Sequence, residues 1–330
     1  MEKLAPGIRF VGTLMRLSPA TSISKVPLDQ VERIQKIPEP THPVAKRVSG
    51  SMLNLMMGGV QKGIKVEDRT ISNPGGVSNV PIRIYTPERV TSALRPLVVY
   101  FHGGGWVLGS LRMGDWMCSV TAHELDAVVV SVDYRLAPQH KFPAGLEDCY
   151  TALVWCSENG ASLGADAGRL GVMGESAGGN LAAVVCLLAK ERGGPQIKHQ
   201  ALLYPAVGGS METDSCRINK DALILTAADM ETYYNYYVNA DTDPRDWRIG
   251  PLFAPDFSGL PPAIIIVAGH DPLHDDGVAY AKKLREAGIN VTLQDYPAMP
   301  HGFLNFPHFS RDAKPAFKEV IKSQRAALQK

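Results

Sequence analysis

Apolar and polar positions follow two rhythms along most of the chain. Residues 97–101 and 127–132 are continuous apolar runs, which are typical of strands buried on both faces of a parallel sheet. Further strands are predicted at residues 170–173, 201–204, 264–268 and 290–296. Apolar residues at helical spacing predict helices between the strands, at residues 113–125, 146–158, 177–192, 276–287 and 313–328. Strands that alternate with helices predict an α/β fold with a mainly parallel central sheet and helices on both faces.

Two further strands precede this alternating region and differ from it. They are predicted at residues 64–72 and 80–85, with a turn between them. In the second strand Ile82 and Ile84 alternate with more polar neighbours, as in a strand with one buried and one exposed face. We expect an outer antiparallel hairpin here.

Two segments of the chain contain no predicted strand. Residues 1–60 are interrupted by prolines and fit short helices. Residues 207–250 carry one predicted helix, at 227–238, and polar turns. We predict that these two segments form the two parts of a helical cap. The α/β core would then consist of residues 61–206 and 251–330.

Composition and charge limit the classes of partner and the location. The chain has 330 residues, of which 45% are hydrophobic and 20% charged, and its formal net charge is +1. Its scattered charges give no reason to expect a nucleic acid or an anionic membrane as partner. Its five cysteines show neither a C-x-x-C motif nor zinc-ligand spacing, so we expect buried reduced thiols. We see no signal peptide and no apolar run long enough to span a bilayer, and we therefore expect a cytoplasmic protein without stable membrane insertion.

One short stretch combines strand, turn and helix signals around a serine. Gly174-Glu175-Ser176-Ala177-Gly178 follows the predicted strand at 170–173 and opens the helix at 177–192. A G-x-S-x-G sequence in this setting is typical of a nucleophile elbow, a tight turn that exposes the serine. The glycines are needed because larger side chains would collide where the strand and the helix cross. The alternative is an ordinary turn in which the serine only caps the helix.

A serine hydroxyl becomes an effective nucleophile only with a base, an orienting acid and donors for the oxyanion. The stretch His102-Gly103-Gly104-Gly105-Trp106 directly follows the strand at 97–101. Its glycines allow backbone N–H groups to turn toward a substrate oxygen, together with the N–H of Ala177. We expect His102 to anchor this loop rather than to act as the base. A phosphate-binding loop is the weaker interpretation, because neither G-x-G-x-x-G nor G-K-[ST] is present.

Candidates for the acid and the base come later in the chain. Asp271 and His301 each follow a predicted strand closely, so both are expected at the carboxyl edge of the sheet. Asp275 and Asp276 compete for the role of the acid, but they lie at the start of a predicted helix, where acidic side chains are favourable in any protein. The neighbouring histidines form no H-E-x-x-H motif, so we expect no metal site.

Together these motifs resemble the α/β-hydrolase fold, and within it the bacterial hormone-sensitive-lipase-like carboxylesterases of family IV. The likeness covers about residues 64–330 and rests on the segments His102-Gly103-Gly104-Gly105-Trp106, Asp133-Tyr134-Arg135-Leu136-Ala137-Pro138, Phe142-Pro143-Ala144, Gly174-Glu175-Ser176-Ala177-Gly178-Gly179-Asn180, Asp271-Pro272-Leu273 and His301-Gly302-Phe303. Ser176, Asp271 and His301 also stand in the order nucleophile, acid and base of this fold. Glu175 departs from the family, which most often has Asp or Thr at this position, and its role is left open.

The resemblance implies a reaction and a set of residues that carry it. Ser176 would be the nucleophile, His301 the general base and then acid, and Asp271 the residue that orients the histidine. The substrate would be a small-molecule carboxylic ester with a short to medium acyl chain, and no cofactor would be needed. The oxyanion hole would consist of Gly104, Gly105 and Ala177, with loop support from His102 and Gly103.

Other expectations concern the pocket, the assembly and competing functions. The substrate pocket would include Trp106, Glu175, Tyr204 and Met211. A homodimer through the sheet edge near residues 290–296 follows from family analogy. An amidase or peptidase would use the same kind of triad. A non-catalytic small-molecule-binding relative is a further alternative, although such relatives typically lack the triad histidine that this chain has at His301.

Overall fold

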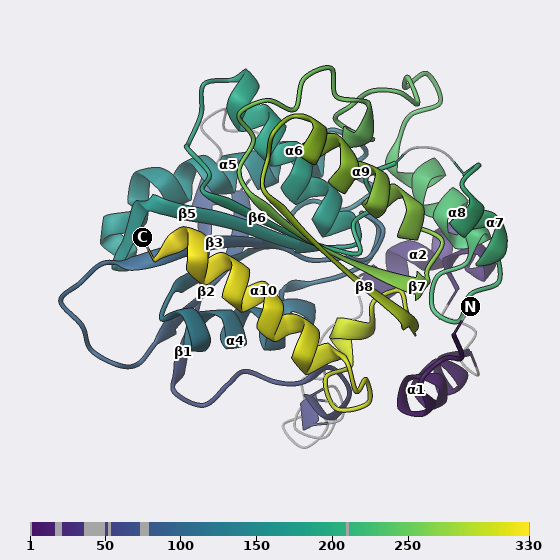
Figure 1. The fold of residues 1–330 in the computed structure, drawn as a ribbon, viewed down its shortest axis with the longest axis horizontal. Coiled ribbons are helices and arrows are strands. Elements are labelled where there is room, and N and C mark those ends of the chain that lie inside the picture. Colours follow the sequence, from purple (N-terminus) through teal and green to yellow (C-terminus); the bar gives the residue numbers. More distant parts are fainter. Residues whose placement is uncertain are drawn as a thin grey trace.

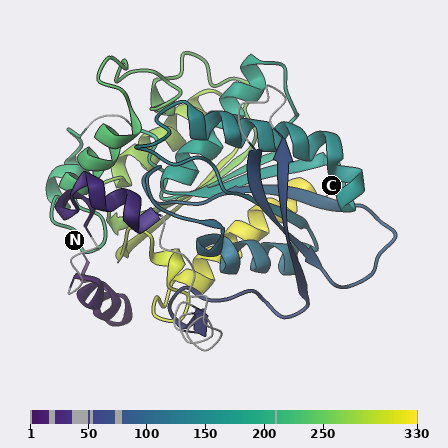
Figure 2. The same ribbon diagram turned by 180° about the vertical axis from the view of Figure 1, so that it is seen from behind.

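The computed structural model describes residues 2–16, 22–35, 50–51, 54–72, 79–208 and 211–329. Eight strands form one sheet in the order β1-β2-β4-β3-β5-β6-β7-β8 (Figure 1). The strands are β1 (Ile64–Ser72), β2 (Asn79–Pro87), β3 (Arg95–Phe101), β4 (Val128–Val132), β5 (Ala165–Glu175), β6 (His199–Leu203), β7 (Ala263–His270) and β8 (Val291–Pro300). β2 pairs in antiparallel fashion with both β1 and β4, and all other pairs are parallel (Figure 2). The predicted mainly parallel sheet with an outer antiparallel hairpin is confirmed.

Helices cover both faces of this sheet. The α-helices are α1 (Pro6–Arg16), α2 (Leu28–Gln35), α4 (Asp115–Leu125), α5 (Ala144–Asn159), α6 (Ala177–Glu191), α7 (Asp214–Ile218), α8 (Ala227–Tyr237), α9 (His274–Glu286) and α10 (Ala313–Leu328). Short 3₁₀ turns are η2 (Ile23–Lys25), η3 (Leu111–Gly114), η4 (Gly160–Leu163), η5 (Pro251–Phe253) and η6 (Phe303–Asn305). α5, α6 and α9 lie on one face, and α4 and α10 lie on the other (Figure 1). The helices predicted between the strands are therefore confirmed, with boundaries that differ by two residues at most.

Strand β3 shows why the central strands are apolar without interruption. Leu97, Val99 and Phe101 belong to the apolar cluster that contains α5 and α6. Val98 and Tyr100 point to the opposite face and belong to the cluster that contains α4 and α10. All five side chains are completely buried, because helices cover both faces of the sheet.

The parallel strands place their carboxyl ends at one edge of the sheet. β3 leads into the loop at residues 102–106, and β5 leads into Ser176. β7 is followed by Asp271, and β8 by His301. α2, α7 and α8 lie at the same end of the molecule (Figure 1). The topology therefore brings four loops that are distant in sequence to one place.

The segment between β6 and β7 carries α7 and α8 and has no strand among its described residues. α8 confirms the helix predicted at 227–238, and a capping box between Thr226 and Asp229 begins it. α7 was not predicted, because its five residues are too few to show a helical repeat.

Part of the N-terminal segment lies outside the description. This applies to residues 17–21, 36–49 and 52–53, and to the predicted turn between β1 and β2. The division of the chain into cap and core stays a prediction.

All five cysteines are unpaired and buried, as predicted. None of the helices in the described part of the chain has the length and the apolar character needed to span a bilayer.

One carboxylate joins the N-terminal segment to α8. Oδ1 of the buried Asp229 accepts hydrogen bonds from the Ser22 hydroxyl (2.6 Å) and from the backbone N–H (3.1 Å) and hydroxyl (3.0 Å) of Ser24. Its Oδ2 accepts from the backbone N–H (3.2 Å) and the hydroxyl (2.7 Å) of Thr226. Burial alone would raise the pKa of Asp229, but the hydrogen bonds outweigh it and lower this pKa. Asp229 is therefore a charged acceptor shared by two segments that are about two hundred residues apart in sequence.

Replacing this acceptor is expected to loosen the N-terminal segment. Asp229→Ala should lower the local free energy of unfolding by about 2 to 3 kcal/mol, because five donors lose one charged acceptor. Limited proteolysis should then cleave the N-terminal segment faster than in the unchanged protein. Asp256→Ala is the matched control, since Asp256 is an exposed acceptor for Lys190 and Ser258. Equal cleavage rates in the two variants would contradict this role of Asp229.

Candidate active site

Ser176 lies at a strained turn between β5 and α6. Its backbone has φ 54° and ψ −120°, a conformation that side-chain-bearing residues rarely adopt. The backbone N–H of Ser176 donates to the carbonyl of Leu203 at the end of β6 (2.9 Å), and its carbonyl accepts from the N–H of Ala206 (3.2 Å). The Ser176 hydroxyl makes no capping bond to α6, which argues against the interpretation as an ordinary helix cap.

The sequence permits this turn because Gly178 has no side chain. A Cβ at Gly178 would lie 2.0 Å from the carbonyl oxygen of Phe101, which is far inside contact distance. α6 therefore begins directly against the end of β3, and Ser176 is held beside the loop that follows β3.

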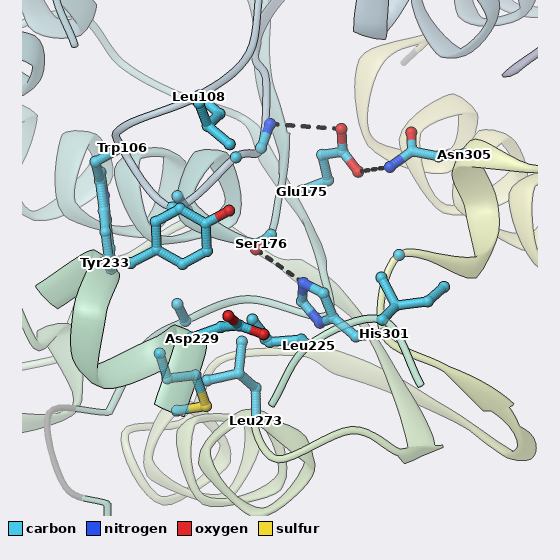
Figure 3. A pocket seen from close by; sticks show the side chains of 18 of the residues that line it. Trp106, Leu108, Glu175, Ser176, Leu225, Asp229, Tyr233, Leu273, His301 and Asn305 are labelled. Carbon is cyan, nitrogen blue, oxygen red and sulfur yellow. Dashed lines mark hydrogen bonds between the residues drawn. The ribbon is translucent and has the colours of Figure 1, made fainter. Parts of the chain in front are cut away.

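A chain of hydrogen bonds links Ser176, His301 and Asp271. The distance from Ser176 Oγ to His301 Nε2 is 2.9 Å (Figure 3). The distance from His301 Nδ1 to Asp271 Oδ2 is 2.7 Å. Oδ1 of Asp271 accepts from the backbone N–H of Leu273 (2.8 Å). Asp271 is completely buried and His301 nearly so. Because the Asp271 carboxylate only accepts, Nδ1 carries the ring proton and Nε2 is free to accept the proton of the serine.

The two competing carboxylates have other partners. Asp275 Oδ2 accepts from the backbone N–H of Ser215 (2.8 Å), and Asp275 Oδ1 lies 3.0 Å from Nδ1 of His274. Asp276 is buried at the start of α9 and accepts from the backbone of Gly208. The carboxylate in contact with His301 is that of Asp271.

The loop after β3 is built on a buried histidine. His102 is completely buried, and its ring stacks on Tyr134 with centroids 4.3 Å apart. Nδ1 of His102 donates to the carbonyl oxygen of Gly103 (2.8 Å), and the Tyr134 hydroxyl donates to the backbone carbonyl of His102 (2.8 Å). Burial lowers the pKa of His102 to about 4, so the ring is neutral at neutral pH. His102 thus packs under the loop and is separate from the Ser176–His301 contact.

Three backbone N–H groups around Ser176 remain open to a ligand. Gly104, Gly105 and Ala177 line the same cavity as Ser176 and His301. Their N–H groups have no acceptor within the described part of the chain. Gly104 has φ 112°, and a Cβ there would lie 2.1 Å from the Leu108 carbonyl, so only glycine fits. A hydroxyl near a base and N–H donors together suit a reaction in which negative charge develops on an oxygen.

The cavity has a volume of about 570 Å³ and mostly apolar walls. Its lining includes Leu108, Leu225, Met230, Tyr233, Leu273 and Phe306 (Figure 3). Of the pocket candidates from the sequence, Trp106, Glu175 and Met211 also line it. Tyr204 lies behind the wall instead, almost fully buried, with its ring edge against His301 at 5.0 Å between centroids.

The carboxylate of Glu175 lies beneath Ser176 and is completely enclosed. It accepts hydrogen bonds from Tyr100, Gly103 and Tyr204. It also accepts one from Asn305 (Figure 3). Burial raises its pKa, and these hydrogen bonds oppose that shift. Glu175 is therefore a site residue that contacts both the loop after β3 and the residues that follow His301.

Several lining residues were not found from the sequence. Asn305 had no signal beyond its position shortly after His301. Leu225, Asp229 and Met230 belong to the insertion, where their side chains gain a role only once α8 lies over the carboxyl edge. The lining residues 229, 230, 233 and 234 of α8 do follow helical spacing, which was the available signal. Among the described residues, no group of three or more His, Cys, Asp or Glu side chains is arranged to hold a metal ion.

Comparisons with known proteins agree with this geometry. A family described as the alpha/beta hydrolase fold matches residues 98–305. Carboxylic ester hydrolase LipN of Mycobacterium tuberculosis is 42% identical over 291 residues, which are 86% of this chain and 76% of LipN. Carboxylesterase NlhH of the same organism is 44% identical over 247 residues, 74% of this chain and 76% of NlhH. The structure of a hyperthermophilic esterase from the archaeon Pyrobaculum calidifontis has a TM-score of 0.85 and 36% identity, covering 98% of this chain and 99% of that one.

Asp276 has the electrostatic setting of a neutral acid in this cavity. Burial above all, and then the nearby charges of Asp271 and Asp275, raise its pKa to about 7, against the hydrogen bond from Gly208. The folded protein therefore binds the proton of Asp276 more tightly than the unfolded chain does. The resulting stability is fully present below the unfolded pKa of 3.8 and is lost as the pH rises through about 7.

Asp276→Asn should remove this pH dependence. We expect the stability difference between the variant and the unchanged protein to shift in favour of the variant as the pH rises from 5 to 8, by up to about 4 kcal/mol across the full titration. Melting temperatures measured over this pH range provide the test. A stability difference that does not change with pH would show that Asp276 titrates normally.

Proposed function

Since the chain is a carboxylic ester hydrolase of the α/β-hydrolase family, among the hormone-sensitive-lipase-like esterases (family IV), we propose that Ser176, His301 and Asp271 are its catalytic residues. The observation that carries the proposal is the continuous hydrogen-bonded chain from Ser176 Oγ through both ring nitrogens of His301 to Asp271. It supports the triad because each atom stands where proton transfer requires it.

The reaction follows from this geometry. Ser176 Oγ attacks the ester carbonyl carbon while its proton passes to Nε2 of His301. The new oxyanion accepts hydrogen bonds from the N–H groups of Gly104, Gly105 and Ala177. When the carbon–oxygen bond to the alcohol breaks, His301 returns the proton to the leaving oxygen, and an acyl group remains on Ser176. His301 then takes a proton from water, the hydroxide attacks the acyl carbon, and the acid is released from the regenerated serine.

The orienting acid contributes through its position. Asp271 holds the Nδ1 proton of His301, so the opposite nitrogen keeps its lone pair toward Ser176. When the imidazole becomes charged, the buried carboxylate stabilises it. The hydrogen bond from Leu273 fixes the carboxylate in turn.

The cavity supports a small-molecule ester with a short to medium acyl chain as substrate. Its volume of about 570 Å³ is within the usual range for small-molecule sites, and its apolar side chains suit an acyl chain. Four carboxyl side chains also line it (Glu175, Asp229, Glu231 and Asp276), and no lysine or arginine does so among the described residues. This lining favours a neutral ester over one that carries a free carboxylate.

The cap, the assembly and the location also belong to this proposal. Lining residues from α8 support a cap formed by the N-terminal segment and residues 207–250. β8 is an edge strand of the sheet, which supports a homodimer through this strand. The cytoplasmic location stays a prediction from the sequence.

Removing the nucleophile or the base is expected to abolish turnover. Ser176→Ala and His301→Ala should each lower kcat for 4-nitrophenyl butyrate by about 10⁴-fold or more, because the two residues act as a unit. A fluorophosphonate probe should label the unchanged protein and should leave Ser176→Ala unlabelled. Full activity in the alanine variant would refute the mechanism. An unchanged protein that neither hydrolyses the ester nor binds the probe would instead favour the non-catalytic relative.

Acyl-chain length should limit the rate. With 4-nitrophenyl esters from C2 to C16, we expect kcat/KM to be highest for short to medium chains and to fall for C12 and longer, because a long chain exceeds the enclosed apolar volume. An anilide of the best acyl group should be hydrolysed far more slowly if the enzyme is an esterase. A steady rise in kcat/KM toward C16 would contradict the proposed substrate class.

A further inference from the structure

The carboxylate of Glu175 bridges the two loops that flank the nucleophile. We propose that Glu175 is a positioning residue, whose carboxylate ties the oxyanion loop to the loop that carries His301 and so keeps both aligned with Ser176. This inference rests on the proposed function, because it concerns the residues assigned there to the oxyanion and to the base.

The two carboxylate oxygens of Glu175 divide between the two sides of the site. Oε1 accepts from the Tyr100 hydroxyl at the end of β3 (3.2 Å) and from the backbone N–H of Gly103 in the oxyanion loop (3.4 Å). Oε2 accepts from the Tyr204 hydroxyl after β6 (3.0 Å) and from the side-chain amide of Asn305 in η6 (2.6 Å). Figure 3 shows the hydrogen bond between Glu175 and Asn305. One planar group therefore fixes the separation of the two loops.

On the oxyanion side, the contact is close to the reacting atoms. Gly103 immediately precedes Gly104 and Gly105, which line the cavity and are assigned above to the oxyanion. A Cβ at Gly103 would lie 3.2 Å from the Glu175 carbonyl oxygen and 3.3 Å from Ser176 Cβ, so the loop rests directly on the elbow. A shift of the Glu175 carboxylate would move the Gly103 N–H and, with it, the oxyanion donors.

On the base side, two residues carry the effect to His301. The backbone N–H of Asn305 donates to the carbonyl of Gly302 (3.0 Å), which closes the turn directly after His301. The ring of Tyr204 meets the His301 ring edge-on, with centroids 5.0 Å apart. The hydrogen bonds from Asn305 and Tyr204 to Glu175 thus restrain the position of the imidazole.

The charge of Glu175 also acts on His301 through space. The groups that face His301 are Asp271 at Nδ1, the Ser176 hydroxyl at Nε2 and the Tyr204 ring at its edge, and Glu175 is close enough for its charge to act on the imidazole. Asp276 lines the same cavity and is close to Asp271. His301 lowers the pKa of Glu175, although burial is the larger influence and raises it. By reciprocity, the Glu175 carboxylate favours the imidazolium that forms during the reaction.

Glu175→Gln tests the proposal, because it preserves the volume and removes the charge. An amide has an NH2 group, which donates, in place of one of the two accepting oxygens of the carboxylate. It therefore cannot accept hydrogen bonds on both sides of the bridge. We expect kcat for 4-nitrophenyl butyrate to fall roughly 10- to 100-fold with a change in KM of less than about threefold, since alignment rather than substrate binding is lost. The acid limb of the kcat/KM profile should move to lower pH by roughly half to one unit, because the imidazolium loses a negative neighbour.

Asp115→Asn is the matched control. Asp115 is a buried carboxylate that accepts from the Tyr85 hydroxyl (2.6 Å) and from Arg83 (3.1 Å), and it lies on α4 rather than at the site. This variant should lose stability and keep the unchanged pH profile. Equal pH profiles for Glu175→Gln and the unchanged protein, with unchanged kcat, would overturn the proposal.

A double-mutant cycle separates positioning from a general structural role. Asn305→Ala should lower kcat in the unchanged background and should have little further effect in Glu175→Gln, because both changes break the same bridge. Fully additive losses would overturn the proposal. If Glu175→Gln does not fold, Asn305→Ala and Tyr204→Phe replace it in the test. In each of these two variants the fold-decrease in kcat must exceed the fold-change in KM, or the proposal fails.

The control for the underlying function is the unchanged protein. If it hydrolyses the ester and its Ser176 is labelled by a fluorophosphonate, while the variants behave as the unchanged protein does, only the role of Glu175 is refuted. If the unchanged protein shows neither activity nor labelling, the proposed function itself fails.

Discussion

The strained turn at Ser176 is the constraint on which the rest of the site depends. A residue with a side chain holds φ 54° here because hydrogen bonds to Leu203 and Ala206 fix it from the neighbouring strand end. The close contact of Gly178 with β3 then sets the distance between Ser176 and the loop that follows β3. Successive residues at this turn serve two purposes: Ser176 hydrogen-bonds to His301, and the carboxylate of Glu175 connects the surrounding loops.

The loop after β3 is held from α2 and α8 as well as from the sheet. The side-chain amide of Gln35 in α2 donates to the carbonyls of Val107 (2.6 Å) and Ala137 (2.7 Å). From α8, Tyr237 stacks on Trp106 at 4.5 Å between centroids, and Tyr233 fills the space that a Cβ at Gly105 would need. The helix α8, which contributes to the lining of the cavity, therefore also supports the loop after β3.

The fold and the meeting of Ser176, Asp271 and His301 were predictable from the sequence because both depend on topology. Continuous apolar runs identify parallel strands, and parallel strands place the residues that follow them at one edge. The contacts of Asp229 with Ser22 and Ser24 were not predictable, because they join polar residues of irregular segments that lack any periodic pattern. Tyr204 was expected in the pocket, but it follows β6 in a tight turn with φ 37° that directs its ring behind the wall.

The acidic groups around the site illustrate how neighbours, rather than residue type, determine charge. Asp229 is buried, yet five hydrogen bonds lower its pKa and keep it charged. Asp276 is equally buried, has one backbone donor and two acidic neighbours, and its pKa is raised to about 7. Glu175 lies between these two cases: burial raises its pKa, and hydrogen bonds from Asn305, Tyr204 and Gly103 oppose that shift.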